Sequence, residues 1–539
     1  MKNVLTSFQK ALGSTNNEKQ IRFSLWLTAS YLIVAVVAIV HHEMWRDEYQ
    51  TWLVVSQSHS ILDLWNNSQY EGHALLWHFI LFIITQFTQN PLSMQLVHVA
   101  LAASAILIMA VFSPFTRFQK ILLSFGYFLL YEYAVISRYY VLTVLLLFVA
   151  LSLFHNSKRK PIVFAIVLFL LANTSIFGVV FSVLLMVLVV HQFITGQQGD
   201  KSLIAGNWRT LVATGIFISG VSFSLYSIQR GAQTTFAQTS FLWQGGLNSK
   251  RLVFTISEIL AALVPIPNTF QPDFWNKSIV FDLSWEMRVI LAICIIGFFF
   301  WSFQKNRSVL FFWGSGVLTI GMLVYRLLIP AIRYGGHIYL LLVASLWLNN
   351  LLSDRSGIPR LKKVKRTLQS SESFFFQSIL LLQVIAGCIA CYLDIRYPFS
   401  NCDKAGRYLA REEISHQCLY GSPDFIVSPL TAFVHRPIYY PERDSVGTYI
   451  ISDNKRKQFP PMWEVVEKAT NLIHKTCDSM LLILSDSISY VQNNRILEIV
   501  DQQPHIDVYL KLLQKFNTPC IALDETYYIY QLSCVQLKE

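Results

Sequence analysis

Two adjacent carboxylates, Asp47 and Glu48, follow the first long apolar run of the sequence, which covers 23–40. If that run spans a membrane, the two acids lie at the membrane boundary. A carboxylate held beside apolar surface has a raised affinity for protons, which suits a general base. The pair is therefore a candidate catalytic site. The alternative is a solvated helix start, because Asp and Glu favour the first turn of a helix.

Two arginines, each followed by a tyrosine, are candidates for binding a phosphate group. Arg138 precedes Tyr139 between two apolar runs, and Arg333 precedes Tyr334 before a later run. A guanidinium forms a bidentate fork that fits phosphate oxygens. One alternative is an ion pair between Arg138 and Glu132 at the membrane boundary. The other is a plain turn between two helices around Arg333.

Further polar residues near these candidates in the sequence are assigned supporting roles: Arg46, Glu71, His73, Glu132 and His337. Carboxylate oxygens suit Mg²⁺ or Mn²⁺, and an imidazole admits Zn²⁺. If a divalent metal is a cofactor, Asp47, Glu71 and His73 are the residues that would hold it. No spacing among these residues is diagnostic of a metal site, so no cofactor is assigned.

The composition indicates which elements must position these residues. Hydrophobic residues make up 53% of the chain and only 14% are charged, against about 25% in an ordinary soluble protein. The mean hydropathy is +0.43. Apolar runs of the length that a spanning helix needs recur from residue 23 to residue 393. These values exclude an ordinary soluble enzyme and a disordered chain, and they predict an α-helical polytopic membrane protein.

The net charge of +11 belongs to the apolar part of the chain. Residues 1–393 hold 28 Lys and Arg against 14 Asp and Glu, whereas 394–539 hold 15 against 18. Short basic loops stay in the cytoplasm. The basic clusters can all lie on one face of the membrane only if one early run does not cross it, and the run 73–88 fits an interfacial or re-entrant helix. We therefore expect about 11 spans, within a range of about 11 to 13, and a cytoplasmic N-terminus. The charge is not interpreted as a site for nucleic acid.

This topology places the polar clusters on the extracytoplasmic face of a multi-pass protein of the plasma membrane. The first outer loop, 41–92, is expected to hold interfacial helices beside the acidic pair. A long outer loop, 229–287, is expected to be a lid over a bound substrate, with a packed surface loop as the alternative. The membrane domain therefore covers 1–393.

Residues 394–539 are expected to form an extracytoplasmic α/β domain with a mostly parallel sheet, because short apolar segments alternate with helix-like runs. The predicted strands lie near 425–427, 448–451, 480–484, 520–523 and 527–532, and the predicted helices near 403–413, 461–476 and 506–516. Its cysteines can oxidise outside the cell, and the local pairs are Cys402–Cys418 and Cys520–Cys534. An accessory domain that grips an acceptor and a structural cap are both open.

The membrane part resembles the polytopic glycosyltransferases of the GT-C fold, and is similar to the superfamily of protein O-mannosyltransferases and lipid A aminoarabinose transferases. The resemblance covers 20–350 and rests on the order of Asp47-Glu48, Glu71-Gly72-His73, Ser137-Arg138-Tyr139-Tyr140 and Arg333-Tyr334. Ala74-Leu75 departs from the Pro-Pro of the family's second stretch. The acid that some members carry after the Arg-Tyr element is absent, which leaves Glu132 on its other side.

The resemblance implies a hexosyl- or pentosyltransferase of cell-envelope glycan biosynthesis, which moves a sugar from a polyprenyl-phosphate donor to a glycan, lipid or protein acceptor at the outer face, with inversion. Asp47 would be the base and Glu48 would orient the acceptor. The donor phosphate would be bound by Arg138, Tyr139, Arg333 and Tyr334. The rival functions are a polymerase or ligase of lipid-linked glycans and a transporter or flippase of lipid-linked substrates. A transporter predicts internal repeats and charges near mid-membrane, whereas the sequence shows no repeat and its acids cluster at one face.

Overall fold

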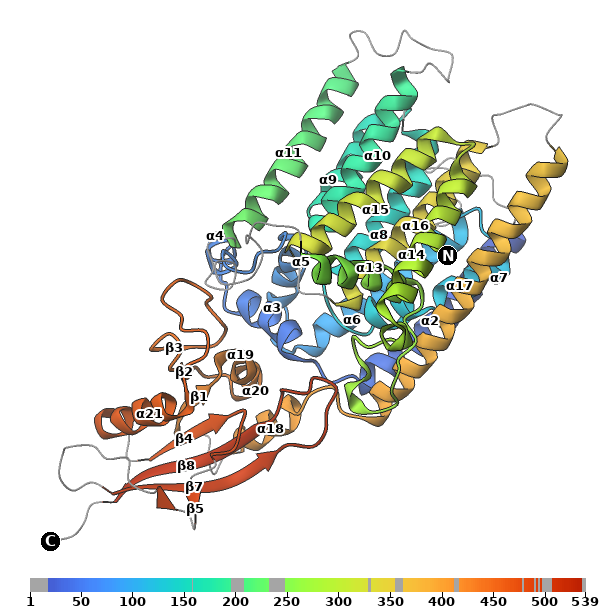
Figure 1. Cartoon of the computed structure of the whole chain (residues 1–539). Coiled ribbons are helices and arrows are strands. Elements are labelled where there is room, and N and C mark those ends of the chain that lie inside the picture. The colour runs from blue at the N-terminus through green and yellow to red at the C-terminus, as the bar shows by residue number, and fades with distance from the viewer. Residues whose placement is uncertain are drawn as a thin grey trace.

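The computed structural model describes residues 18–157, 159–194, 208–231, 248–327, 331–353, 362–411, 416–476, 479–488, 491–492, 495–496 and 507–535. Within these residues the chain forms a helical bundle that ends at Arg396 and a C-terminal domain built on one sheet. The domain packs against one end of the bundle (Figure 1). Some basic residues of the expected cytoplasmic face, including Lys2, Lys158 and Lys201, lie outside the described residues.

Seven helices in the described part of the chain are long and apolar enough to cross a membrane. They are α2 (Glu18–His41), α6 (Leu92–Phe112), α11 (Trp208–Arg230), α14 (Trp285–Phe303), α15 (Arg307–Leu327), α16 (Ile332–Ser353) and α17 (Lys362–Arg396). Their outward faces carry exposed apolar side chains, such as Ile33 of α2 and Ile293 of α14. Faces of this kind are stable in lipid, so the chain is a membrane protein.

Shorter apolar helices occupy other expected spans. They are α8 (Tyr140–Leu153), α9 (Pro161–Ala172) and α10 (Ile176–Ile194). The run near 119–136 is not one helix, because α7 (Arg117–Ser124) is followed by a separate π-helix, η1 (Tyr127–Glu132). α17 crosses at this break, where a Cβ on Gly387 would lie 3.0 Å from the carbonyl oxygen of Phe125. The close approach of two backbones explains why the helix is interrupted there.

The first outer segment, 41–92, contains α3 (Arg46–Ser56), α4 (Ile61–Asn67) and α5 (Leu76–Thr85). α5 has 10 residues, and at about 1.5 Å per residue it reaches about half of a bilayer core. α4 exposes Ile61 and Leu62, as an interfacial helix does. α3 is buried along most of its length, because it lies between the bundle and the C-terminal domain (Figure 1). It is therefore not a helix on the bilayer surface.

The described part of the expected outer loop 229–287 is packed into the bundle. It contains α13 (Ser249–Leu263) and two short 3₁₀ turns, η6 (Pro272–Phe274) and η7 (Ile279–Asp282). The C-terminal half of α13 is buried. Its backbone lies so close to α16 that a Cβ on Gly335 would be 2.9 Å from the carbonyl oxygen of Glu258. α13 is therefore part of the bundle, and the interpretation of the rest of the loop as a lid stays a prediction; 232–247 lie outside the described residues.

Hydrogen bonds join the helix ends that carry the basic residues. Gln20 of α2 donates to the carbonyl of Ala110 of α6 at 3.0 Å, and Gln119 of α7 donates to Ser373 of α17 at 3.2 Å. Ser302 of α14 donates to a carboxylate of α17 at 2.6 Å. Helix α7, which makes one of these contacts, lies at the end of the bundle away from the C-terminal domain (Figure 1). The described basic residues near these contacts in sequence are Lys19, Arg22, Arg117, Lys120, Lys305 and Arg307.

The C-terminal domain contains one mixed sheet of order β3-β2-β1-β4-β8-β7-β6-β5. Its strands are β1 (Cys418–Ser422), β2 (Ile438–Tyr440), β3 (Ser445–Gly447), β4 (Ser479–Leu484), β5 (Val491–Gln492), β6 (Arg495–Ile496), β7 (Asp507–Phe516) and β8 (Tyr527–Val535). β1 pairs in parallel with β2 and β4, and the other pairings are antiparallel. The prediction of a mostly parallel sheet is therefore wrong.

The helices of this domain are α18 (Cys402–Leu409), α19 (Asp424–Val427), η9 (Ser428–Leu430), α20 (Thr431–Val434) and α21 (Met462–Thr476). The predicted strands at β4 and β8 and the predicted helices at α18 and α21 are confirmed. The predicted helix 506–516 is wrong, because this segment is β7 and pairs with β8, with Leu510 buried and Lys511 exposed. The predicted strand 425–427 is wrong, because it lies in α19. The segments 448–451 and 520–523 form no strand.

The cysteines of the domain pair differently from the expected local pairs. Cys418 is in a disulfide, whereas Cys402 and Cys520 are buried free thiols. Both proposed pairs, Cys402–Cys418 and Cys520–Cys534, are therefore wrong. Neighbours in sequence are a poor guide here, because Cys402 lies on α18 and Cys418 begins a strand at the far side of a segment outside the described residues.

We expect Gly220→Leu to destabilise the bundle. A Cβ on Gly220 of α11 would lie 2.6 Å from the ring of Phe169 and 2.8 Å from its Cα on α9, so the two helices would have to separate. Overpacking of this kind costs about 1–3 kcal/mol. The midpoint of thermal unfolding of the solubilised protein measures the loss.

Gly215→Leu on the same helix is the matched control, because no atom lies within 4 Å of a Cβ at that position. Both substitutions gain about 0.8–1 kcal/mol of helix propensity, so the difference between the two variants isolates the packing of Gly220. Equal unfolding midpoints for the two variants would contradict the arrangement of α9 and α11.

Candidate functional site

Glu48 holds the first turn of α3 inside the bundle. Its side chain is fully buried. One carboxylate oxygen accepts the backbone N–H of Ser137 at 2.6 Å, and the other lies 3.1 Å from the backbone nitrogen of Trp45 and 3.1 Å from Nε2 of His42. Both oxygens are thus occupied. Glu48 therefore positions the site, and the expectation that it orients the acceptor does not fit this geometry.

His42 extends this buried network to the end of α17. Its Nδ1 lies 2.9 Å from Asp394, and its Nε2 faces Glu48. All three side chains are buried. The ends of α2, α3 and α17 are therefore joined by one imidazole between two carboxylates.

The loop 133–139 is fixed from a second direction by His98 of α6. The ring nitrogens of His98 lie 3.0 Å from the carbonyl oxygen of Ala134 and 2.9 Å from that of Arg138. Together with the contact of Glu48 to the backbone of Ser137, this holds the loop against α3. The loop can therefore present Arg138 to α3 in a fixed orientation.

Asp47 forms an ion pair with Arg138. Burial alone would raise the pKa of Asp47, but Arg138, Arg333 and Arg46 outweigh it and lower the pKa below the ordinary value. The Asp47 side chain is 33% exposed and that of Arg138 is 11% exposed. Asp47 is thus an ionised carboxylate that solvent or a ligand can reach.

Arg333 lies on the aromatic floor of the same site. Its guanidinium carbon is 5.6 Å from the ring centroid of Trp45, 5.4 Å from that of Trp275 and 5.2 Å from that of Tyr334. Such distances allow a cation–π attraction. Glu132 lies nearby and accepts a hydrogen bond from Trp275 at 3.1 Å. The structure thus brings Arg333, Tyr334 and Glu132 to the pair of Asp47 and Arg138.

Tyr139 and the two predicted histidines complete the surroundings. The ring of Tyr139 lies 4.8 Å from that of His73, and its hydroxyl donates to Tyr140 at 3.0 Å. Burial, with help from Arg138, lowers the pKa of His73 to about 3, so this imidazole is neutral. His337 stacks on Phe177 with centroids 3.8 Å apart.

Buried polar atoms without a protein partner gather at this site. Among the described residues, Nε of Arg138, Nε of Arg333, Nε2 of His337 and the hydroxyl of Ser137 are buried and unpartnered. Buried polar groups in native proteins are nearly always satisfied. These atoms are therefore candidates for contact with a bound polar ligand or with water.

Glu71 faces α3 from the other side of the loop 68–75. It accepts a hydrogen bond from Gln50 at 2.8 Å, and burial raises its pKa. Gln50 also exchanges two hydrogen bonds of 3.0 Å with the backbone of Ile450 in the C-terminal domain. Gly72 adopts a positive φ of 65°, which allows its backbone to pack on Gly231 after α11. Glu71 thus has a positioning role.

No group of three or more possible metal ligands occurs within the described residues. Asp47 pairs with Arg138, Glu71 accepts from Gln50, and His73 packs against Tyr139. The three residues that were expected to hold a divalent metal, Asp47, Glu71 and His73, therefore each contact a different residue and form no common ligand set.

The C-terminal domain holds the first residue of α3. Glu525, which is fully buried, accepts the backbone N–H of Arg46 at 3.0 Å and a hydrogen bond from the hydroxyl of Ser400. The guanidinium of Arg46 lies 2.6 Å from Asp524. Arg46 therefore ties the candidate site to the second domain, a role that its position in the sequence does not indicate.

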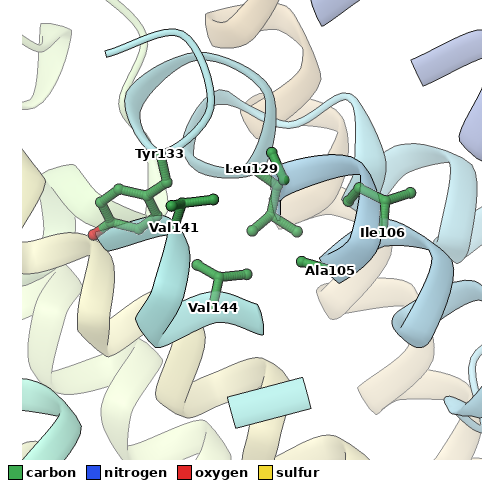
Figure 2. Close-up of a pocket in the computed structure, with 7 residues that line it drawn as sticks. Ala105, Ile106, Leu129, Tyr133, Val141 and Val144 are labelled. Atoms are coloured by element: carbon green, nitrogen blue, oxygen red, sulfur yellow. The ribbon is translucent and has the colours of Figure 1, made fainter. Parts of the chain in front are cut away.

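A small apolar gap lies between α6, η1 and α8 (Figure 2). Its volume is about 10 Å³, which is about the room for one water molecule. The hydroxyl of Tyr133 points away from the gap (Figure 2) and donates to the carbonyl of Arg333 at 2.6 Å. The gap is too small for a lipid or a sugar.

No family model matches the chain, and no curated protein matches it. The assignment of a function therefore depends on the residues and their geometry.

We expect the stability of the protein to depend on pH through Glu525. Burial raises the pKa of this carboxyl to about 7, although Arg46 acts in the opposite direction. Between the ordinary pKa of 4.5 and about 7, the folded protein holds a proton that the unfolded chain has released. The stabilising contribution is therefore complete below pH 4.5 and is lost as the pH rises through about 7.

Glu525→Gln does not titrate but keeps an acceptor for the backbone of Arg46. Thermal unfolding at about pH 5 and about pH 8 should therefore differ less in this variant than in the wild type. Glu467→Gln changes an exposed acid of α21 and should keep the wild-type difference. An unchanged pH dependence in Glu525→Gln would show that the buried carboxyl is not the titrating group.

Proposed function

We propose that the protein is a membrane glycosyltransferase that moves a sugar from a polyprenyl-phosphate donor to an acceptor at the extracytoplasmic face. The observation that carries the proposal is the pairing of Asp47 with Arg138 next to Arg333, at the end of the bundle that contacts the C-terminal domain. A reactive acid beside two guanidinium groups suits a reaction that takes a proton from one partner and releases a phosphate from the other.

The donor phosphate is bound by Arg138 and Arg333 in this proposal. Each guanidinium carries a buried Nε without a protein partner, and a phosphate group offers oxygen acceptors for both. Tyr139 and Tyr334 flank the two arginines. A lipid donor reaches the protein laterally from the membrane. A site at the end of the bundle, where the outer surface of the membrane is expected, fits such a substrate.

Asp47 acts as the general base. A phosphate between the two arginines competes with Asp47 for their charge, so donor binding weakens the ion pair and raises the basicity of Asp47. The acceptor hydroxyl then attacks the anomeric carbon and its proton passes to Asp47. The bond from that carbon to the phosphate oxygen breaks, and the polyprenyl phosphate leaves with the electron pair toward the two guanidinium groups. A single displacement inverts the configuration.

The membrane topology in the proposal has a cytoplasmic N-terminus, an extracytoplasmic C-terminal domain, about 11 spans and a GT-C-like arrangement. Two observations support the orientation. Helix α7, which carries Arg117 and Lys120, lies at the end of the bundle away from the C-terminal domain (Figure 1), as cytoplasmic basic segments do. The disulfide at Cys418 fits an oxidising compartment.

We expect Asp47→Asn to lower transfer by at least about 100-fold, because loss of a general base has an effect of this size. The assay measures sugar transfer by the purified protein from a panel of polyprenyl-phosphate sugars to envelope extracts. Asp63→Asn on α4 is the control, since it changes an acid of the same outer segment and should keep wild-type transfer. Wild-type transfer by Asp47→Asn would refute the assignment of the base. Specific transport in liposomes, with no transfer from any donor, would favour the transporter.

Arg138→Gln should shift the pH profile of transfer. The guanidinium stabilises the ionised form of Asp47, so its removal raises the pKa of that carboxyl. The acid limb of the profile of kcat/KM is then expected at higher pH, and KM for the donor should rise. Arg411→Gln removes an exposed arginine of the C-terminal domain and should change neither. A lower kcat with the acid limb at the wild-type pH would show that Arg138 does not control the ionisation of Asp47.

A further inference from the structure

A pocket of about 300 Å³ lies in the C-terminal domain at one edge of the sheet. Its lining includes Pro423, which follows β1, Asp486, which follows β4, and Thr526, which precedes β8. β1 and β4 are parallel neighbours, so their carboxyl ends meet at this edge. The size is at the lower end of the range of small-molecule sites.

The topology of the sheet marks this edge as a place for a ligand. From β1 the chain continues to β2 on one side, and from β4 it continues toward β5 at the opposite end of the sheet. Connections that leave adjacent parallel strands in opposite directions open a crevice at the carboxyl ends of the strands, and open α/β sheets bind their ligands there. The pocket lies at such a point.

The lining of the pocket combines aromatic rings with carboxylates. The rings of Phe425 and Phe459 meet at 89° with their centroids 6.2 Å apart, and Phe459 is 71% exposed. Asp486 and Asp524 contribute the carboxylates. The negative face of an aromatic ring attracts polarised C–H groups, and ionised carboxylates accept hydrogen bonds from hydroxyls. Together these groups suit a sugar ring rather than an anion.

Arg46 connects this pocket to the candidate active site. Its guanidinium carbon lies 5.3 Å from the ring centroid of Phe425, and a guanidinium nitrogen lies 2.6 Å from Asp524. Both of these residues line the pocket. The next residue is Asp47, which pairs with Arg138. A molecule in the pocket therefore lies beside the first turn of α3, on the side of the C-terminal domain.

We propose that this pocket is the acceptor subsite and binds a neutral, hydroxyl-rich glycan, which it holds beside Asp47. The proposal rests on the transferase function proposed above. It gives the two domains separate tasks, because the arginines of the bundle take the phosphate of the donor and the acids and rings of the sheet domain take the acceptor. No Lys or Arg lines the described part of the pocket, and the guanidinium of Arg46 beside it is paired with Asp524, so the pocket is not built for a second lipid phosphate.

The test measures binding of neutral oligosaccharides to the full chain in lipid nanodiscs by saturation-transfer NMR. The probes are linear trisaccharides of glucose, galactose and mannose. We expect at least one of them to bind the wild type, and Phe459→Ala to raise its Kd about threefold to tenfold. Asp486→Asn should also weaken binding. Both side chains are exposed, so these changes leave the fold intact.

Matched controls come from the same domain. Trp463→Ala removes an aromatic ring of α21 that is 63% exposed and lies outside the pocket lining, and Glu467→Gln removes an exposed acid. Both should bind the probe as the wild type does. The proposal is overturned if no trisaccharide binds the wild type, or if Phe459→Ala and Asp486→Asn bind as well as the two controls.

A further variant separates this proposal from the proposed function. Asp47→Asn should keep trisaccharide binding, because Asp47 does not line the pocket. If transfer fails with every donor while binding still depends on Phe459 and Asp486, the sugar site stands and the transferase does not. If transfer occurs but binding does not depend on Phe459 and Asp486, the transferase stands and the sugar site does not.

Discussion

The first turn of α3 is held between two buried carboxylates that approach it from opposite sides. Glu48 bonds inward to the backbone of Ser137 and to His42, and Glu525 of the C-terminal domain accepts the backbone N–H of Arg46. A buried charge without partners is costly, and removing one partner of a buried pair commonly destabilises a protein by about 3–5 kcal/mol. Each acid therefore has little freedom, and the orientation of α3 is fixed with respect to both domains. The rest of the site depends on this orientation.

One consequence is that two adjacent acids have different tasks. Neighbouring residues of a helix point about 100° apart, so when Glu48 faces the bundle, Asp47 faces the outer end. There it meets Arg138 and remains one-third exposed. The same turn places Arg46 against Asp524 and Phe425 of the sheet domain. The site thus lies where the membrane bundle ends and the second domain begins, with cationic groups on one side and an acidic, aromatic pocket on the other.

The sequence indicates the short motifs well and the long-range contacts poorly. Asp47, Arg138 and Arg333 stand out because they are charged residues on the face that the predicted topology places outside, and the structure brings them together. The role of Glu48 is not visible, because its partners on the loop 133–139 are about 90 residues away. Glu525 is separated from Arg46 by 479 positions, and nothing in its neighbourhood marks it. In the sheet domain β7 is mistaken for a helix, because pairing with β8 decides its conformation and local pattern does not.

We propose that Arg138 and Arg333 bind the phosphate of a lipid carrier beside Asp47. A cryo-electron microscopy structure of the full chain in nanodiscs, prepared with a polyprenyl phosphate, tests it most directly. We expect density for a phosphate within hydrogen-bond distance of both guanidinium groups, with the ion pair of Asp47 and Arg138 opened. A carrier phosphate bound elsewhere, or an unchanged ion pair with no density at the two arginines, would show that these residues do not bind the donor.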